Sequence, residues 1–347
     1  MDFSFIIPVY NCKPYLSACV ESILACQVPS TEVILVDDGS TDGSAVLCDA
    51  LARKDSRIRV LHQANAGVSA ARNVGLSTAK GSHILFADAD DTLDTEALKR
   101  MLTDPRCFQA DLTLFGVSFD YYHHGNCYRS EPLFYSKEGN LTPQQWGRDL
   151  VSLYMSNSLS SSCTKAFKRS IIVENTLALN TDMFLYEDME FVLRYLACCK
   201  SIMNVPYPIY HYRQSEDEGN AGRRLSRISG IPAYLAPVEE AFRNLSEAND
   251  SVSPADCETI LQRLHLLLAR EKISVSDMRT IRSICQDYRA WEPEHISTPE
   301  RSMFRTQLMK EQVASILFHR LKGNARHRLA VFIKSAIHRF RRKGTSK

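Results

Sequence analysis

The sequence lacks any apolar run long enough to cross a bilayer, which takes about 20 consecutive residues. Its first strand-like segment follows directly on Met1 and Asp2 without a basic segment, so we expect no signal peptide. The 11 cysteines include no Cys-x-x-Cys pair, which favours reduced cysteines acting as small hydrophobic residues. We therefore expect a cytoplasmic protein whose 347 residues fold into two or three units, since 44% apolar residues suffice for their cores.

Apolar runs of strand length alternate with segments of helix length in the amino-terminal part of the chain. We expect strands at residues 3–9, 32–36, 58–62 and 84–87, and helices around 16–24, 45–54 and 68–78. Thr41 or Asp42 is the expected N-cap of the second helix. The alternation predicts an α/β fold of the Rossmann-like kind, with a mostly parallel sheet and flanking helices. No Gly-x-Gly-x-x-Gly follows the first strand, so the usual dinucleotide-binding fingerprint is missing.

Three carboxylates, Asp88, Asp90 and Asp91, follow directly on the fourth expected strand. Open α/β sheets bind their ligands beyond the carboxyl ends of their strands. Crowding these acids into four positions costs repulsion, which a divalent cation relieves by taking hard oxygen ligands. The pattern therefore predicts a metal site that faces a phosphate-bearing substrate.

Two other interpretations of these acids remain open. Asp91 or Thr92 could simply cap a helix at 94–101. Residues 88–93 also imitate the opening motif of haloacid dehalogenase-type phosphatases, in which Asp88 would be the nucleophile. That family needs Gly where Asp91 stands and usually opens near the start of its catalytic domain, whereas three strand–helix units come first here.

The chain resembles a known family in several segments. Residues 5–11, 36–42, 67–75 and 86–91, followed by 163–169, 186–191 and 210–214, are similar in order and spacing to family 2 glycosyltransferases of the GT-A fold, of the bacterial polysaccharide or lipopolysaccharide type. Each motif is weak alone, but the ordered set over residues 3–214 is specific. The part beyond 214 resembles no family that we can name.

The resemblance implies a nucleotide-sugar donor and a bound Mn²⁺ or Mg²⁺, and the role that it gives to Asp38 favours a UDP-sugar. Asp90 would ligate the metal directly, and Asp88 would contact the ribose or help to hold the metal. Asp38 would accept the imide N–H of uracil. The residues expected to bind the donor are Pro8, Tyr10, Asp37, Asp38, Arg72, Asn73, Asp88 and Ala89. Asp37 and Asp38 could instead build the turn around Gly39, and Arg72 could be a solvated helix residue.

The acceptor side is implied by the pair Glu187 and Asp188. By resemblance, Asp188 is the base that removes the acceptor's hydroxyl proton, and the attack inverts the anomeric configuration. Acidic residues would also suit the first turn of an amphipathic helix without any catalytic role. Lys165, Glu187 and Arg213 are expected to contact phosphate or acceptor, although Lys165 and Arg213 could equally pair with the acidic cluster.

Two further residues invite a functional interpretation that the sequence does not require. His211 could be a metal ligand, but we expect an ordinary strand residue. Trp146 could stack on an acceptor sugar or anchor the core.

We expect three regions along the chain. Residues 1–105 form the nucleotide-sugar-binding half of a GT-A domain, 106–215 its acceptor-binding half, and 216–347 a helical extension with a basic amphipathic tail. A linker or lid is expected at 215–224, and helices at 235–247, 255–272, 275–290 and 300–321.

The last segment concentrates positive charge. Residues 320–347 hold ten Lys or Arg and no acid, and removing them from the net charge of +2 leaves −8 for residues 1–319. Apolar residues recur at helical spacing between these charges, which is typical of a helix that lies on an anionic membrane. A solvated helix packed on its own protein is the simpler alternative. Nucleic acid is the competing partner for such charge, but we expect none.

Taken together, the sequence predicts an inverting, metal-dependent glycosyltransferase, peripheral on the inner face of the cell membrane. It would transfer a sugar to a saccharide or lipid-linked acceptor in cell-surface polysaccharide synthesis. The alternatives are a haloacid-dehalogenase-like phosphohydrolase and a non-catalytic scaffold that binds sugar nucleotide. The sugar, the acceptor and the linkage are not encoded in these motifs.

Overall fold

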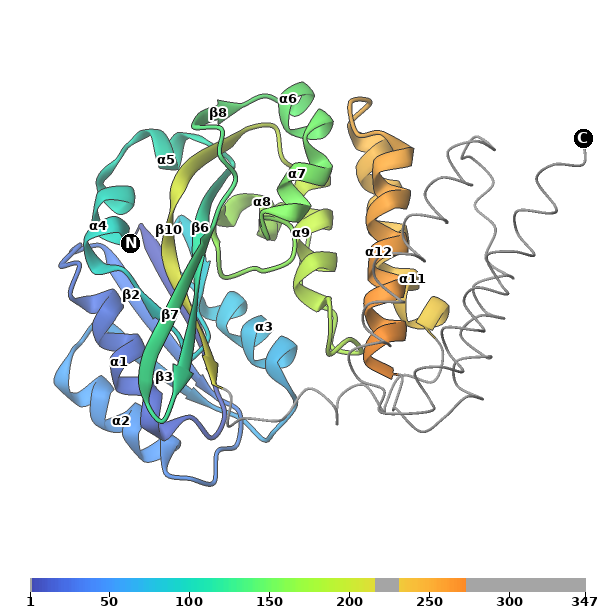
Figure 1. The fold of residues 1–347 in the computed structure, drawn as a ribbon. Coiled ribbons are helices and arrows are strands. Elements are labelled where there is room, and N and C mark those ends of the chain that lie inside the picture. The colour runs from blue at the N-terminus through green and yellow to red at the C-terminus, as the bar shows by residue number, and fades with distance from the viewer. Residues whose placement is uncertain (1, 216–230, 273–347) are drawn as a thin grey trace, which may run out of the picture. The chain divides into compact units, whose positions relative to one another are not determined.

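The computed structural model describes residues 2–215 and 231–272, and one mixed β-sheet forms their centre (Figure 1). Within these residues the strands are β1 (Phe3–Val9), β2 (Thr31–Asp37), β3 (Ile58–His62), β4 (His83–Phe86), β5 (Thr92–Leu93), β6 (Leu112–His123), β7 (Asn126–Leu133), β8 (Gly139–Leu141), β9 (Lys165–Lys168) and β10 (Ile202–Ser215). Their order is β3-β2-β1-β4-β9-β6-β10-β5, with β7 paired to β6 and β8 to β10. The predicted α/β class is confirmed.

The sheet is parallel through its first four strands and mixed beyond them. β2 and β4 both pair in parallel with β1, and β3 pairs in parallel with β2. β9 runs antiparallel to its neighbours β4 and β6, whereas β6 and β10 are parallel to each other. β1 and β2 are almost entirely buried. Central parallel strands are covered on both faces, so their sequences are nearly continuous apolar runs. The carboxyl ends of β1, β2 and β4 therefore meet at one edge of the sheet.

The described helices lie on both faces of this sheet, with α1 and α2 on one side and α3 on the other (Figure 1). They are α1 (Lys13–Leu24), α2 (Ser44–Lys54), α3 (Val68–Thr78), α4 (Thr95–Thr103), α5 (Arg106–Gln109), α6 (Pro143–Arg148), α7 (Leu150–Met155), α8 (Arg169–Glu174), α9 (Glu187–Ala197), α11 (Ile231–Ala248) and α12 (Pro254–Lys272). None of them is long and apolar enough to span a membrane.

The N-cap predicted for α2 is wrong in its position. Gly43, with φ of 92°, occupies it, and neither Thr41 nor Asp42 does. The Asp42 carboxylate instead accepts from the N–H and the hydroxyl of Ser44 (2.9 and 2.6 Å), one residue into the helix. A left-handed residue is needed here to turn the chain, and glycine adopts that conformation without strain.

An aromatic cluster fixes α9 against the sheet. Phe86 of β4, Phe167 of β9, and Phe191 and Tyr195 of α9 contact one another edge to face, with ring centroids 5.0 to 6.1 Å apart. Such packing holds a helix rigidly because each ring is buried and has a defined geometry. α9 therefore starts at a fixed place beside β4.

The two halves predicted for residues 1–105 and 106–215 share this one sheet, since β9 and β6 continue from β4. Residues 232–261, which hold α11 and the start of α12, cluster with the sheet in one compact unit, whereas 262–272 belong to a second. The predicted helices 235–247 and 255–272 correspond to α11 and α12. The expected helices 275–290 and 300–321, the linker at 216–224 and the basic tail 320–347 lie outside the described residues.

Candidate active site

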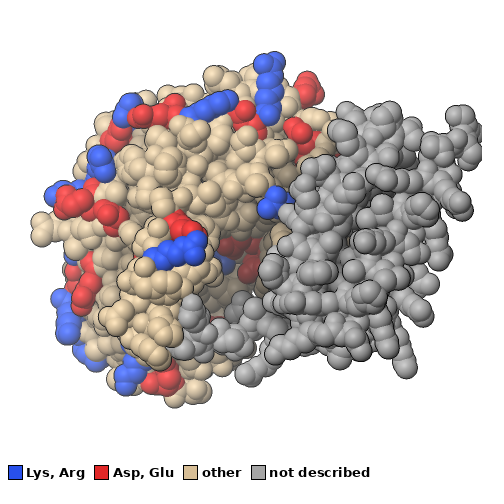
Figure 2. Space-filling model, viewed as in Figure 1, with Lys and Arg blue, Asp and Glu red and all other residues tan. Residues whose placement is uncertain are grey.

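The three acids after β4 lie in different environments. The Asp88 side chain is 34% exposed and Asp90 is exposed, whereas Ala89 and Asp91 are buried. The turn is tight, because the N–H of Asp91 donates to the carbonyl of Asp88 (3.1 Å). Asp88 and Asp90 can therefore face a ligand while Asp91 faces the protein. On the face drawn in Figure 2, the surface is hollowed near the middle of the view, and acidic side chains line the hollow.

Asp91 ties the acidic turn to β10. Its carboxylate accepts from the Tyr210 hydroxyl (2.6 Å) and from the N–H of Arg213 (2.7 Å). The same hydroxyl accepts from the N–H of Asp88 (2.9 Å). Burial, and then the charges of Asp88 and Asp90, raise the pKa of Asp91 to about 9. The helix-cap interpretation of Asp91 and Thr92 is wrong, because Asp94 caps α4 by accepting from the N–H of Ala97 (2.7 Å).

Arg72 of α3 joins the acidic turn to the start of α9. One terminal nitrogen of its guanidinium donates to Asp88 and the other to Asp188, each at 2.7 Å. The Arg72 side chain is only 4% exposed. Burial alone would lower the pKa of Arg72, but the carboxylates of Asp188 and Asp88 raise it well above its ordinary value. The alternative of a solvated Arg72 is wrong, because the guanidinium is a buried link between two acids of the site, and donor binding by Arg72 stays a prediction.

Asp188 is held from both of its oxygens. Oδ1 accepts from Arg72, and Oδ2 accepts from the backbone N–H and the hydroxyl of Ser162, both at 3.0 Å. The side chain keeps 16% of its surface exposed. The carboxylate is therefore fixed in direction yet open to a ligand, as a base must be.

The segment before α9 has a strained backbone at Tyr186, and hydrogen bonds from α11 stabilise it. Tyr186, the N-cap of α9, has φ of +64°, which costs a residue with a side chain of the order of 1 kcal/mol or more. The hydroxyl of Tyr234 in α11 accepts from the N–H groups of Phe184 and Leu185 (3.0 and 2.8 Å) and donates to the Leu185 carbonyl (3.0 Å). These bonds hold the turn that aims Glu187 and Asp188 at the site.

Two ionisable neighbours of Asp188 have shifted pKa values. Burial, and then the charge of Asp188, raise the pKa of Glu187 to about 7. Burial lowers the pKa of Lys165 to about 7, although the charge of Asp188 opposes the change. The Lys165 ammonium is fully buried and donates to the Ser161 carbonyl and the Thr164 hydroxyl (3.2 Å). Both partners are neutral oxygens, so pairing of Lys165 with an acid stays a prediction, as does contact of Lys165 or Glu187 with a substrate.

At the end of β2, Asp38 organises the loop that leads into α3. Its Oδ1 accepts from Gln63 Nε2 and the N–H of Ala66 (2.7 and 2.8 Å), and Oδ2 accepts from the N–H of Gly67 (2.9 Å). A carboxylate oxygen has about two acceptor positions, so Oδ2 retains one for another donor. Recognition of a base by Asp38 stays a prediction that this geometry allows.

The other residues expected around the donor have identifiable partners or exposure. Asp37 accepts from the N–H of Ser40 and contacts His62 Nδ1 (3.1 and 3.0 Å), as the turn interpretation predicts. The side-chain amide of Asn73 donates to the Leu179 carbonyl (2.9 Å) and accepts from the Leu179 N–H (2.8 Å). Pro8 lies in β1, and Tyr10 just beyond it is exposed. Donor binding by these residues is not tested by their contacts.

Three residues of the acceptor half have identifiable surroundings, and contact of Arg213 with phosphate or acceptor stays a prediction. The Arg213 guanidinium lies 3.6 Å from the ring centroid of Tyr122 and 4.8 Å from that of Tyr15. His211 is a strand residue, as predicted, and contacts the Asp120 carboxylate (2.7 Å). Trp146 is almost completely buried, so it anchors the core and cannot stack on a sugar at the surface.

The donor set at the acidic turn fits a hard divalent cation in part. Asp88 and Asp90 offer carboxylate oxygens at the surface, and their charges add to burial in raising the pKa of Asp91. Within residues 2–215 and 231–272, no group of three His, Cys, Asp or Glu is arranged to hold a metal alone. Mg²⁺ and similar ions usually complete such sites with substrate phosphate and water. The residues therefore fit a metal that binds together with a phosphate ligand.

Two important contacts were not predicted from the sequence. Ser162 orients Asp188, and Tyr210 connects Asp88 with Asp91. Tyr210 lies within the segment 210–214, so that motif indicated its neighbourhood, whereas Ser162 precedes the segment 163–169 by one residue and had no signal of its own.

Comparison with known proteins identifies related sequences. Residues 4–160 match the model of the family described as Glycosyl transferase family 2. The chain is 28% identical over 241 residues to the glycosyltransferase EpsJ of Bacillus subtilis (strain 168), covering 69% of this chain and 67% of that protein. It is 31% identical over 263 residues to the poly(ribitol-phosphate) beta-glucosyltransferase of Bacillus spizizenii, covering 74% and 38%. Glycosyltransferase GlyG of Streptococcus pneumoniae is 43% identical over 112 residues, and the chain spans only 37% of its length.

Solved structures agree on the fold. The crystal structure of S. aureus TarS 1-349 in complex with UDP aligns with a TM-score of 0.55 at 21% identity, covering 99% of this chain and 92% of that one. The complex of the same protein with UDP-GlcNAc aligns with a TM-score of 0.56 at 20% identity, over 96% of this chain and 89% of that one. At this identity the likeness shows the shared GT-A architecture alone.

Proposed function

Because this chain belongs to glycosyl transferase family 2, we propose that it transfers a sugar from a UDP-linked donor to a saccharide hydroxyl with inversion of the anomeric configuration. One observation carries the proposal: Arg72 connects an acid of the turn after β4 with Asp188 on α9. A group suited to the donor diphosphate and a group suited to the acceptor hydroxyl thus lie in one site.

On the donor side, Asp88 and Asp90 would hold Mn²⁺ or Mg²⁺ together with the diphosphate. Such an ion, when bound, stabilises the negative charge that develops on the leaving diphosphate, by several kcal/mol. Asp38 keeps an acceptor position for the imide N–H of uracil, and the exposed Tyr10 beside Pro8 can cover the nucleoside. The S. aureus TarS structures with UDP and UDP-GlcNAc support a uridine donor for this fold.

On the acceptor side, Asp188 would take the hydroxyl proton. Oδ1 has one hydrogen bond, from Arg72, and so retains an acceptor position for the incoming hydroxyl. Ser162 and Arg72 hold the carboxylate in one orientation. This favours reaction, because the base is already oriented when the acceptor binds. The proton would move to Oδ1 as the acceptor oxygen attacks the anomeric carbon.

We further propose that the acceptor is a lipid-linked or polymeric saccharide of the cell surface, reached at the membrane's inner face. Ten Lys or Arg without any acid in residues 320–347 support attraction to anionic lipid. The relative named as a poly(ribitol-phosphate) beta-glucosyltransferase supports a cell-surface polymer. The phosphohydrolase alternative loses its support, because the matching family is a glycosyltransferase family and Asp88 is bound by a buried guanidinium.

Release of UDP from a panel of UDP-sugars in the presence of Mn²⁺, without acceptor, tests this function. We expect slow hydrolysis of at least one UDP-sugar by the full chain, and none by Asp90→Ala. Binding without any turnover, with or without added saccharides, would favour the non-catalytic scaffold. Preference for GDP-sugars would contradict the role of Asp38.

A further inference from the structure

A pocket lies on the β6–β7 hairpin and on the carboxyl-terminal part of β10, which contributes Gln214. It has a volume of about 590 Å³, within the range of about 300–1,000 Å³ that is common for small-molecule sites. It is lined by Phe119, Tyr121, Ser130, Glu131, Pro132, Leu133 and Gln214. None of these residues belongs to the donor or catalytic groups described above.

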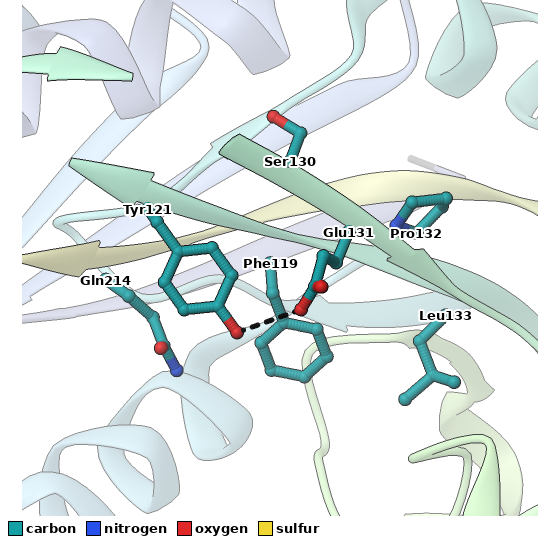
Figure 3. A pocket seen from close by; sticks show the side chains of 7 residues that line it. All are labelled: Phe119, Tyr121, Ser130, Glu131, Pro132, Leu133 and Gln214. Atoms are coloured by element: carbon teal, nitrogen blue, oxygen red, sulfur yellow. Dashed lines mark hydrogen bonds between the residues drawn. The ribbon is translucent and has the colours of Figure 1, made fainter. Parts of the chain in front are cut away.

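The pocket offers one face of the sheet to a ligand. Pairing places Phe119 opposite Glu131 and opposite Tyr212, and Tyr121 opposite Gln214, so their side chains share a face. Figure 3 shows the side chains of Phe119, Tyr121, Glu131, Leu133 and Gln214 pointing to the same side of the strands. The Phe119 and Tyr121 rings are half-buried, which leaves part of each ring open to contact.

The polar groups in the pocket are fixed and suited to hydroxyls. The Tyr121 hydroxyl donates to Glu131 Oε2 (3.2 Å), and Arg129 pairs with the same carboxylate. The hydrogen bond from Arg129 lowers the pKa of Glu131, so the group is a charged acceptor at neutral pH. The Gln214 amide adds both a donor and an acceptor. Aromatic faces beside a carboxylate and an amide suit a sugar, which has apolar C–H faces and hydroxyl edges.

Tyr212 connects this pocket with the acids of the site. Its ring contacts Phe119 edge to face at 5.7 Å. Tyr210, whose hydroxyl donates to Asp91 (2.6 Å), and Tyr212 are two positions apart in β10, so their side chains lie on the same face of the sheet. Gln214 is two residues further along the strand, which is about 6.6 Å. The pocket therefore lies on the face of the sheet from which Tyr210 reaches the acidic turn, so an acceptor that extends along β10 from this turn would meet it.

We propose that the pocket between Phe119, Tyr121, Glu131 and Gln214 binds a neutral saccharide unit of the acceptor, next to the unit that is glycosylated. This inference rests on the proposed function and names its acceptor class. The charged Glu131 disfavours a phosphodiester unit at this position because like charges repel, and it disfavours an acyl chain because such a chain offers the carboxylate no hydroxyl. The pocket thus selects for a glycan rather than a polyol phosphate polymer.

Binding of the full chain, with UDP and Mn²⁺, to an array of neutral oligosaccharides tests the proposal. We expect the wild type to bind at least one glycan. Tyr121→Ala should bind it at least about 5-fold more weakly, as the loss of one aromatic contact predicts, and Glu131→Gln several-fold more weakly. Phe134→Ala is the matched control, because Phe134 is an exposed aromatic residue next to Leu133 that does not line the pocket.

Two results would overturn the proposal. The first is equal glycan binding by the wild type and by both pocket variants, and the second is binding of poly(ribitol phosphate) but of no neutral glycan. Stabilisation by UDP with Mn²⁺, measured on the same samples, distinguishes a wrong pocket assignment from a wrong proposed function. If UDP is bound and hydrolysis of UDP-sugar persists while the glycan results fail, only the pocket assignment is wrong. If UDP is not bound, the proposed function itself is wrong.

Discussion

Replacing Arg72 by Met should destabilise the fold more than the loss of any surface ion pair would. The guanidinium is buried and bridges Asp88 and Asp188 at 2.7 Å each, so its loss leaves two carboxylates without their counter-charge. Breaking a buried pair from one side costs about 3–5 kcal/mol. Asp88 is a third exposed and water can compensate it in part, so we expect about 3 kcal/mol.

Urea unfolding measures this cost as a lower midpoint at unchanged slope. At about 2–4 °C per kcal/mol, the melting temperature should fall by about 6–12 °C. Arg72→Lys keeps the charge but cannot hold two carboxylates in one plane, so it should recover only part of the loss. Arg57→Met is the matched control, because Arg57 pairs with Asp55 at the surface and its loss should cost less than about 1 kcal/mol.

A double-mutant cycle then identifies the partner. Arg72→Met combined with Asp188→Asn should cost less than the sum of the single variants by roughly 1–3 kcal/mol, because the second change removes the charge that the first leaves unpaired. Additive costs, or a loss no greater than that of Arg57→Met, would refute the bridge as a stabilising feature of the site.

Three further predictions address the base, the pH dependence and the membrane. Asp188→Asn should leave UDP binding near wild type and lower transfer by at least about 10²-fold, and retained transfer would exclude Asp188 as the base. Hydrogen bonds to Asp37 and Asp49 raise the pKa of His62 above 6.5, so its contribution is present below that pH and is lost as pH rises through the folded-state pKa. His62→Gln should therefore lower the free energy of unfolding more at about pH 5.5 than at about pH 9, by less than about 1 kcal/mol because the His62 side chain of both pairs is exposed. An equal loss at both pH values would contradict the ion pairs. Truncation after Leu321 should abolish salt-sensitive sedimentation with anionic vesicles, at about 1 kcal/mol per basic residue near the surface; a truncated chain that sediments as well as the full one would contradict the tail's role.

The sequence predicts the strands of the donor half because their apolar runs are local and unbroken. β1 and β2 are buried along almost their whole length, and the acids follow directly on β4 in the sequence, so they must lie at the edge of the sheet where β4 ends. The hairpin of β6 and β7 could not be predicted in this way. β7 is polar and exposed on most positions, so no periodic pattern marks it.

The site was predictable in its residue types but not in its pairings. Arg72 and Asp188 are 116 positions apart, and nothing in the local sequence of either indicates the other. The role of Asp91 depends on Tyr210, which reaches it only because β10 pairs with β5 beside the acidic turn. Such contacts follow from the topology of the whole sheet, which local periodicity and motif spacing do not determine.

The most direct test of a metal-dependent uridine donor site is thermal unfolding with UDP, in Mn²⁺ and in EDTA. The acids Asp88 and Asp90 and the diphosphate repel each other unless a cation lies between them. We predict that UDP raises the melting temperature of the wild type only with Mn²⁺ or Mg²⁺ and that Asp90→Ala removes this dependence, whereas the control Asp55→Ala, far along the chain from the acidic turn, keeps it. Equal stabilisation by UDP in EDTA, or a metal-dependent effect that survives Asp90→Ala, would contradict the account.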